Sequence, residues 1–457
     1  MPNYSSYKNL SDDERIESAK VYLENGHTDD ALTLLSSVLD DDPDHPEALF
    51  HVSQIMTDAD KIGIASALLR RLVEIAPDRA EVWTALGRTI PDDTNEPESL
   101  ACFRKALEID PEYHPAMINM GAVLTHSGRP DKAVRLLTKA LSIDPSSVAA
   151  HDMRGMSHLM LGNWRDGWRD NLWSLGEKFR KEVIFGDEER WDGTPGKAVI
   201  VYGEQGLGDE IMFASVLPDA IEDCKKVIIE CDPKLEGLFK RSFPKAIVYG
   251  TRRLAADWPN NHKWDARCSI GTLPMYYRNS DDEFPGSAYL KADPVRRKQW
   301  RTTLDDLGER PKIGIAWNGG GKYTGRGKRH IPLECFQPLF DIGDVVCLEY
   351  EKVDFEGYPI HHWPHATLTN DYDDTAALVA ELDFVVSTTT TINHLCGALG
   401  VPCHVLVEEK PNYRFYQMKW HDCLSLYRGD HTQNIKDIVN AYISGIQKSG
   451  SAEASGK

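Results

Sequence analysis

The chain has 457 residues, and its 52 Lys and Arg against 71 Asp and Glu give a net charge of −19. That charge argues against general binding to nucleic acid or to an anionic membrane, because both need a basic surface. No apolar run reaches the ~18 residues of a membrane span, the polar N-terminus lacks the pattern of a signal peptide, and nine scattered cysteines without a C-x-x-C pair predict free thiols in the cytoplasm.

A 34-residue period runs through the first third of the chain. A proline recurs at this interval, with a small residue 12 positions before it and a bulky apolar residue 8 positions before it. A helix pair explains the pattern, because the small residue lets two helices approach and the proline ends the second one. The positions are Pro43, Pro77, Pro111 and Pro145; Ala31, Ala65, Ser99 and Ala133; and Leu35, Leu69, Phe103 and Leu137.

The period resembles the tetratricopeptide repeat and predicts an α-helical solenoid over residues 1–175. Gly26, Gly128 and Gly162 fall in the predicted turns, while the segment Pro91–Pro97 replaces the turn of the third repeat. Trp164 and Trp168 are expected to pack against the next domain. The concave surface of such a solenoid usually holds a peptide or protein, and it could also pair copies of the chain.

The acidic excess belongs mainly to this predicted solenoid. Residues 1–100 contain 21 acidic and 8 basic residues, a net charge of −13, so the other 357 residues carry only −6. We therefore expect any partner of the first repeats to be basic or polar.

Beyond a linker at 176–196, short β-branched runs alternate with amphipathic stretches. This alternation predicts parallel sheets covered by helices. The turn residues Pro285-Gly286 and Asp293-Pro294 divide the region into two units, 197–292 and 293–447, and the Ser/Gly/Ala-rich segment 448–457 is predicted to be disordered. The predicted strands are Ala198–Tyr202, Val227–Glu230, Ala246–Tyr249, Lys312–Trp317, Val345–Leu348, Phe384–Ser387 and His404–Val407.

Three loops each follow a predicted strand and open a predicted helix, the place where such folds bind ligands. The first, Gly203–Ile211, has the order G-x-x-G-x-G through Gly206 and Gly208, which is not the dinucleotide-binding order. Asp209 in this loop is either a helix cap or a functional carboxylate.

The second loop, Trp317–His330, combines five glycines with four Lys and Arg, a composition that suits a phosphate group but also a solvated basic turn. The third loop, Ser387–Pro402, offers hydroxyl groups and amides at a helix start, where anions bind. His394 there is either a ligand-binding residue or an ordinary helix histidine. A metal at His361, His362 and His365 with Asp371, Asp373 and Asp374 is the weaker interpretation, because these acids precede a helix and can act as caps.

Taken together, the motifs resemble a family. Arg190-Trp191-Asp192-Gly193, the first loop through Asp209, Arg329–Leu333, Asp374–Leu378 and His394–Gly400 occur in the order found in bacterial tetratricopeptide-repeat glycosyltransferases. The catalytic part of this family is similar to lipopolysaccharide heptosyltransferases and, more distantly, to O-GlcNAc transferase. The resemblance implies a GT-B fold, in which two Rossmann-like units face each other, with the acceptor toward residues 197–292 and the nucleotide sugar in residues 293–447.

The resemblance also implies roles for single residues. Asp209 matches the proposed general base, which would take the proton of an acceptor hydroxyl and give inversion without a metal or other cofactor. The donor side would be formed by Asn318, Lys322, Lys328, Arg329, Glu349, Thr389, Thr390, Thr391 and His394. Glu349 follows a predicted strand, where it could bond the ribose.

The chain departs from the family at two positions. Thr389 stands where an Asp usually contacts the donor sugar, and His330 stands where a Ser is usual. Three functions therefore stay open at this point. They are an inverting glycosyltransferase whose solenoid holds a protein or glycan acceptor, an interaction scaffold with a degenerate transferase domain, and a nucleotide-dependent regulator without sugar transfer.

Overall fold

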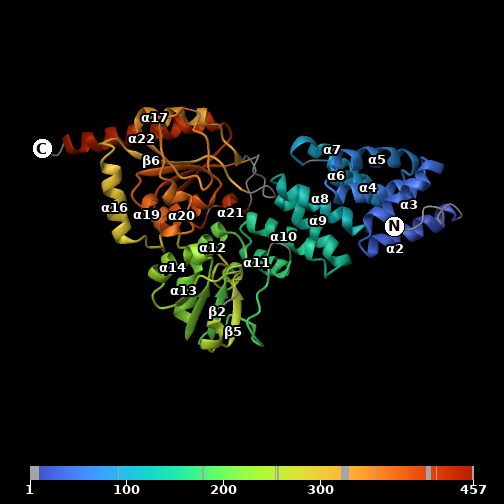
Figure 1. Ribbon diagram of the computed structural model, residues 1–457, viewed down its shortest axis with the longest axis horizontal. Helices are drawn as coiled ribbons and strands as arrows, with labels where there is room; N and C mark the ends of the chain where they lie inside the picture. The colour runs from blue at the N-terminus through green and yellow to red at the C-terminus, as the bar shows by residue number, and fades with distance from the viewer. Residues whose placement is uncertain are drawn as a thin grey trace. The chain divides into compact units, whose positions relative to one another are not determined.

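The computed structural model divides into two compact units, Met1–Ser157 and His158–Lys457 (Figure 1). It describes residues 10–90, 92–177, 180–252, 254, 257–320, 329–355, 357–407, 413–417 and 419–454, with the side chains of 92–95 and 446–454 left out.

The first unit is a row of helices in pairs, drawn in blue to teal in Figure 1. Each predicted proline falls just after the second helix of a pair, as the sequence indicated. The helices are α2 (Asp12–Glu24), α3 (Thr28–Asp41), α4 (Pro46–Asp58), α5 (Ile62–Ile75), α6 (Ala80–Thr89), α7 (Asp92–Ile109), α8 (His114–His126), α9 (Pro130–Ile143) and α10 (Val148–Met160), whose last residues belong to the second unit.

Small residues let the paired helices approach. Ala31, Ala65, Ser99 and Ala133 are all fully buried, as predicted. The sequence reading missed a second set on the preceding helices, Ser53, Gly87, Gly121 and Gly155, again at a 34-residue interval. A Cβ atom added at Gly87 would lie 2.6 Å from the ring of Phe103. One added at Gly121 would lie 2.6 Å from Leu137, so these contacts require glycine.

The turns inside the helix pairs are left-handed. Gly26 and Gly128 have φ angles of 76° and 70°, as a predicted turn glycine should. The equivalent position of the second repeat is Asp60, at φ 59°, the single non-glycine residue with positive φ among those described. In the third repeat α7 begins at Asp92, directly after α6, and carries Pro97 inside it.

The second unit contains two parallel sheets with helices, which confirms the α/β prediction. The first sheet has the order β1-β5-β2-β3-β4 and the second β11-β10-β9-β6-β7-β8. The strands are β1 (Glu189–Arg190), β2 (Ala198–Tyr202), β3 (Lys226–Glu230), β4 (Ile247–Tyr249), β5 (Ala266–Ser269), β6 (Lys312–Ala316), β7 (Asp344–Cys347), β8 (Ile360–His361), β9 (Phe384–Thr388), β10 (Cys403–Val407) and β11 (Leu424–Arg428).

In both sheets the first main strand lies at the centre and the strand order reverses beside it, between β2 and β5 and between β6 and β9. Open α/β sheets bind ligands at such a reversal, at the carboxyl ends of the strands. The helices of this unit are α11 (Trp164–Asn171), α12 (Leu207–Phe213), α13 (Leu217–Asp223), α14 (Glu236–Ser242), α15 (Pro274–Tyr277), α16 (Pro294–Asp305), α17 (Gln337–Ile342), α18 (Pro364–Thr367), α19 (Tyr372–Val379), α20 (Thr391–Leu399), α21 (Tyr413–Tyr416) and α22 (His431–Ala454).

Two predicted boundaries differ from the structure. The second compact unit begins at residue 158 and not after 175. The reason is packing, since Trp164 Nε1 donates to Asp281 Oδ1 at 2.8 Å and Trp168 Nε1 donates to the Arg278 carbonyl at 2.7 Å. The predicted contact of these tryptophans with the following domain is thus confirmed. At the other end α22 continues to Ala454, through most of the segment expected to be disordered, because Ala and Glu in that segment favour helix.

All nine cysteines are free thiols, as the sequence indicated. None of the helices in the described part of the chain combines the length and apolar character needed to cross a bilayer.

Candidate functional site

Two loops that lie far apart in the sequence meet at the candidate site. One joins β2 to α12, the other joins β9 to α20, and Figure 1 draws α12 in green beside α20 in orange. A Cβ atom added at Gly208 would lie 3.2 Å from Thr391 Oγ1 and 3.5 Å from His394 Cδ2. The close approach of the two helix starts therefore depends on the absence of a side chain at Gly208.

Asp209 lies in the first turn of α12 and its carboxylate has two partners. Oδ2 accepts a hydrogen bond from the Gly206 amide at 3.3 Å, so Asp209 caps α12 from the third helical position, whereas the N-cap itself is Gly206. Oδ1 lies 2.6 Å from Nε of Arg414, and the Asp209 side chain is 21% exposed. Asp209 is thus a partly exposed carboxylate that is already neutralised by an arginine.

The sequence reading missed Arg414. It follows β10, so the rule that selected the other loops would also have selected this one. Its Nη2 donates to Gln205 Oε1 at 3.1 Å, and its guanidinium lies 4.8 Å from the centre of the Tyr413 ring. Burial disfavours the charged guanidinium, but the Asp209 carboxylate outweighs burial and raises the pKa of Arg414.

Two further arginines hold the same loop from the inside. Arg180 Nη2 lies 3.2 Å from Glu204 Oε1, and both side chains are buried. Arg252 pairs with the buried Glu210 and donates to the Gln205 carbonyl. Because buried charges are stable only when paired, these contacts fix the loop in one conformation.

His394 lies in the first turn of α20 and is 5% exposed. Its ring centre is 5.3 Å from that of Phe415 and 5.7 Å from that of His421. Burial, assisted by the charge of Arg414, lowers the pKa of His394 to about 3, so the imidazole is neutral at pH 7. Its Nδ1 atom has no hydrogen-bond partner among the described residues.

The start of α20 is capped by its own side chains. Thr390 Oγ1 accepts from the Ile392 amide at 3.2 Å, and Asn393 Oδ1 accepts from the Thr390 amide at 2.8 Å. These groups satisfy donors that a helix start otherwise offers to an anion. Thr391, which follows the cap, is the residue that lies against Gly208.

Glu349 is buried at the end of β7, with an exposed fraction of 1%. Its Oε1 accepts from the amides of Trp317 at 2.6 Å and Asn318 at 2.7 Å. The carboxylate therefore positions the loop after β6, and its predicted contact with a ribose stays a prediction.

The other donor-side residues come together where the strand order reverses between β6 and β9. A Cβ atom added at Gly319 would lie 2.8 Å from the Thr389 carbonyl and 3.1 Å from Cβ of Arg329. Asn318 Oδ1 lies 2.7 Å from Nδ1 of His330, in the same loop. Lys322 and Lys328 lie outside the described residues.

The acids of the weaker metal interpretation have other partners. Asp371 accepts from the Asp373 amide at 3.0 Å, the predicted cap of α19. Arg296 Nη1 lies 2.6 Å from Asp371 and 3.3 Å from Asp374, and Arg241 pairs with Asp373. Within the part of the chain that the structure describes, three or more His, Cys, Asp or Glu side chains nowhere converge as metal ligands would.

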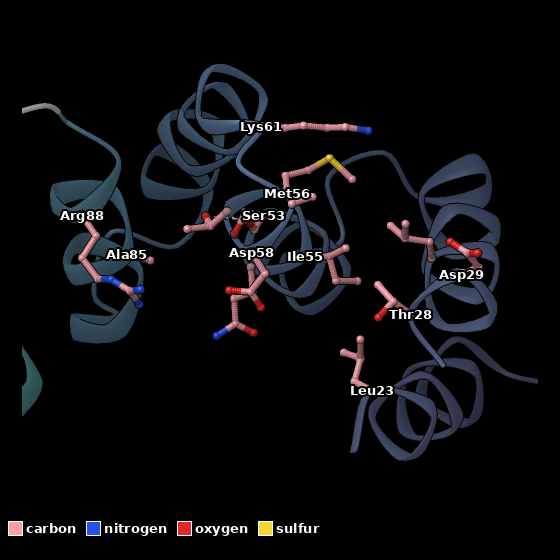
Figure 2. Close-up of a pocket in the computed structure, with 14 residues that line it drawn as sticks. Leu23, Thr28, Asp29, Ser53, Ile55, Met56, Asp58, Lys61, Ala85 and Arg88 are labelled. Carbon is pink, nitrogen blue, oxygen red and sulfur yellow. Dashed lines mark hydrogen bonds between the residues drawn. The ribbon is translucent and has the colours of Figure 1, made fainter. Parts of the chain in front are cut away.

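The solenoid contains a pocket of its own, of about 690 Å³ (Figure 2). Its walls come from the end of α2, the start of α3, the second half of α4 and the end of α6. Charges of both signs line it, from Asp29 and Asp58 and from Lys61 and Arg88, beside apolar side chains such as Met56. The pocket can thus take a segment with both apolar and charged groups.

Comparison with known proteins defines the class of the first unit. Tetratricopeptide-repeat models match residues 22–89 and 114–147. The unit is therefore a solenoid of tetratricopeptide repeats, and such repeats indicate a protein-interaction scaffold.

The curated protein FlbA of Caulobacter vibrioides is 31% identical over 242 residues, which cover 48% of this chain and 41% of FlbA. The chain thus matches less than half the length of that relative. Among solved structures, MamA is 22% identical over 34% of this chain and 92% of its own, with a TM-score of 0.31. A thermophilic repeat protein of Thermus thermophilus, TTC0263, is 19% identical over 36% of this chain and 91% of its own, with a TM-score of 0.32.

Proposed function

We propose that the chain is an inverting, metal-independent glycosyltransferase of the GT-B type. It would move a sugar from a nucleoside-diphosphate donor to a protein or glycan acceptor held partly by the solenoid. The observation that carries the proposal is the meeting of the β2–α12 and β9–α20 loops, since Gly208, the neighbour of Asp209 in one α/β part, lies against Thr391 and His394 of the other. Both loops stand at carboxyl ends of parallel strands, where such sheets bind substrates.

In this proposal Asp209 takes the proton of the acceptor hydroxyl. The acceptor oxygen attacks the anomeric carbon, a new glycosidic bond forms on the opposite face, and the bond to the diphosphate breaks with its electrons. Developing charge on the diphosphate needs cations and oriented dipoles. Arg329 supports this role because it lies against Gly319, which also lies against the Thr389 carbonyl just before the start of α20.

His394 would serve as a neutral hydrogen-bonding group and not as an acid or base. Its pKa of about 3 keeps the imidazole uncharged at neutral pH. The unpartnered Nδ1 atom is buried and polar, and such atoms normally have a partner in the working state of a protein. A donor hydroxyl or phosphate oxygen would supply that partner.

The experiment is a screen of UDP, GDP, ADP and CMP sugars by thermal shift, with product detection for transfer and hydrolysis. We expect at least one nucleotide to raise the melting temperature. Asp209→Asn should keep this binding and lose transfer, whereas the matched control Asp306→Asn, at an exposed site just after α16, should keep both. If no nucleotide binds at about millimolar concentration, the proposal fails. A dissociation constant of about 1 mM corresponds to a binding free energy of about −4 kcal/mol.

The second candidate is a scaffold whose α/β part no longer transfers sugar. Two observations favour it: both oxygens of Asp209 are engaged, and Thr389 stands where the similar enzymes have Asp. It predicts that capture of a partner depends on Lys61 and Arg88 in the solenoid pocket. Capture should then be insensitive to Arg329→Gln and to added nucleotide.

A further inference from the structure

Arg414 ties two loops of the candidate site to each other. It lies after β10, yet two of its side-chain partners, Asp209 at 2.6 Å and Gln205 at 3.1 Å, belong to the loop between β2 and α12. One guanidinium thus contacts both Asp209, the proposed base, and Gln205, which precedes α12 in the sequence.

The Arg414–Asp209 pair is more exposed than the Arg180–Glu204 pair, which also contacts the loop between β2 and α12. The side chains of Arg414 and Asp209 are 22% and 21% exposed, whereas those of Arg180 and Glu204 are 6% and 0% exposed. A partly exposed ion pair is weaker than a fully buried one, and a second anion can compete for its cation. Of Arg180 and Arg414, which both contact the loop between β2 and α12, Arg414 is therefore the one that a ligand could draw away.

The surroundings of Arg414 suit a phosphate. The next residue, Phe415, has its ring centre 5.3 Å from that of His394 in the first turn of α20, and the charge of Arg414 contributes to the lowered pKa of His394. Thr391 and His394 of that turn lie against Gly208, one residue from Asp209. A guanidinium presents parallel N–H donors that match phosphate oxygens, and a diphosphate carries more charge than one carboxylate.

We propose that Arg414 couples donor binding to the availability of Asp209. In the arrangement seen here the guanidinium neutralises Asp209. When phosphate groups of a donor occupy the start of α20, the guanidinium turns to them, and the Asp209 carboxylate is released to take the acceptor proton. Arg414 is then a positioning residue that makes the base available only beside a bound donor, an inference that rests on the proposed function.

The test is calorimetric binding of UDP, GDP, ADP and CMP, and of the matching nucleosides, to four proteins. These are the wild type, Asp209→Asn, Arg414→Gln and the double variant. The double variant removes one charge of each sign, so the net charge equals that of the wild type. If Arg414 stays paired with Asp209 and never contacts phosphate, the wild type and the double variant should bind nucleotide with equal affinity.

If Arg414 turns to the phosphates, the nucleotide affinities of the variants should differ from that of the wild type. Asp209→Asn should bind the best nucleotide about 3- to 10-fold more tightly than the wild type, because no pair has to open. The double variant should bind it at least about 5-fold more weakly than the wild type, because the phosphate contact is gone. Affinities for the nucleoside should agree within about twofold in all four proteins.

The outcomes separate the inference from the proposed function. Equal nucleotide affinity of the wild type and the double variant overturns the inference and leaves the proposed function standing. Absence of binding by every nucleotide to the wild type overturns both.

A crystal structure of the wild type with the best nucleotide provides a second measurement if a variant fails to fold. The expected result is a guanidinium on the phosphate and off the carboxylate. A guanidinium still paired with Asp209 and clear of the phosphate contradicts the inference.

Discussion

Gly208 and Thr391 lie in contact although 183 residues separate them in the sequence. A Cβ atom at Gly208 would meet Oγ1 of Thr391 at 3.2 Å and its Cα atom at 3.4 Å. A side chain at position 208 would therefore crowd the starts of α12 and α20 where they meet.

Gly208→Val should separate these helix starts. Overpacking of this kind costs about 1–3 kcal/mol, and we expect a lower melting temperature together with loss of nucleotide binding. The control is Gly63→Ala in α5, where an added Cβ meets nothing within 4 Å and a helix former should raise stability slightly. Unchanged nucleotide affinity in Gly208→Val would show that the contact is not part of the site.

Asp60→Gly should stabilise the solenoid. Asp60 has φ 59°, a left-handed conformation that costs an L-residue about 1–2 kcal/mol, and glycine avoids most of that cost while losing some chain entropy. We expect the free energy of unfolding to rise by about 1 kcal/mol. Hydrogen exchange of the amides in α4 and α5 during unfolding in urea measures the change. Gly26→Asp, the reciprocal change at φ 76°, should lose a similar amount.

Glu349→Ala tests whether Glu349 positions the loop after β6. Loss of its carboxylate leaves the buried amide of Trp317 and the partly buried amide of Asn318 without this acceptor, at up to about 1–3 kcal/mol each. Glu349→Gln keeps an acceptor oxygen and should recover much of the stability, as measured by thermal unfolding without any ligand. If both variants are as stable as the wild type and only nucleotide affinity falls, a direct ribose contact is the better interpretation.

Glu230 should make stability depend on pH. Burial at the end of β3 raises the pKa of Glu230 to about 7, against 4.5 for the ordinary side chain. The folded state then prefers the protonated acid. The free-energy cost of holding an ionised Glu230 in the folded state is therefore absent below about pH 4.5, grows as the pH rises, and is complete above about pH 7. At about 1.4 kcal/mol for each pKa unit, the full penalty is about 3 kcal/mol.

Glu230→Gln should therefore be more stable than the wild type by about 3 kcal/mol near pH 8 and by almost nothing near pH 4. Denaturant unfolding across this range measures the difference. Glu334→Gln at an exposed position should show no such trend. A gain for Glu230→Gln that is equal at both pH values would assign the effect to packing and not to charge.

Seven strands of the α/β unit could be predicted because they are buried runs rich in Val and Ile, such as β2 and β9. The strand β5, Ala266-Arg267-Cys268-Ser269, was missed because it has no β-branched residue and is held by its place between β1 and β2. The edge strand β11 was missed because one face is partly exposed. These segments form strands because they pair with neighbouring strands, and their own sequences do not reveal that pairing.

The site was predictable at the level of loops and not of contacts. The strand-to-helix positions of Gly208 and Thr391 follow from local patterns, but their meeting depends on how the two sheets pack. The engagement of Glu349 by backbone amides, and of Asp209 by Arg414, arises from residues far apart in the sequence. Such partners are invisible to spacing arguments, although Arg414 follows a predicted strand and its loop could have been selected.

Nucleotide binding compared between the wild type and Asp209→Asn, with sugar transfer measured on the same samples, is the most direct test of the proposed function. We expect both proteins to bind the same nucleotide, the variant at least as tightly, and transfer to occur in the wild type alone. Transfer that persists in Asp209→Asn, or a wild type that binds no nucleotide, would contradict the proposed function.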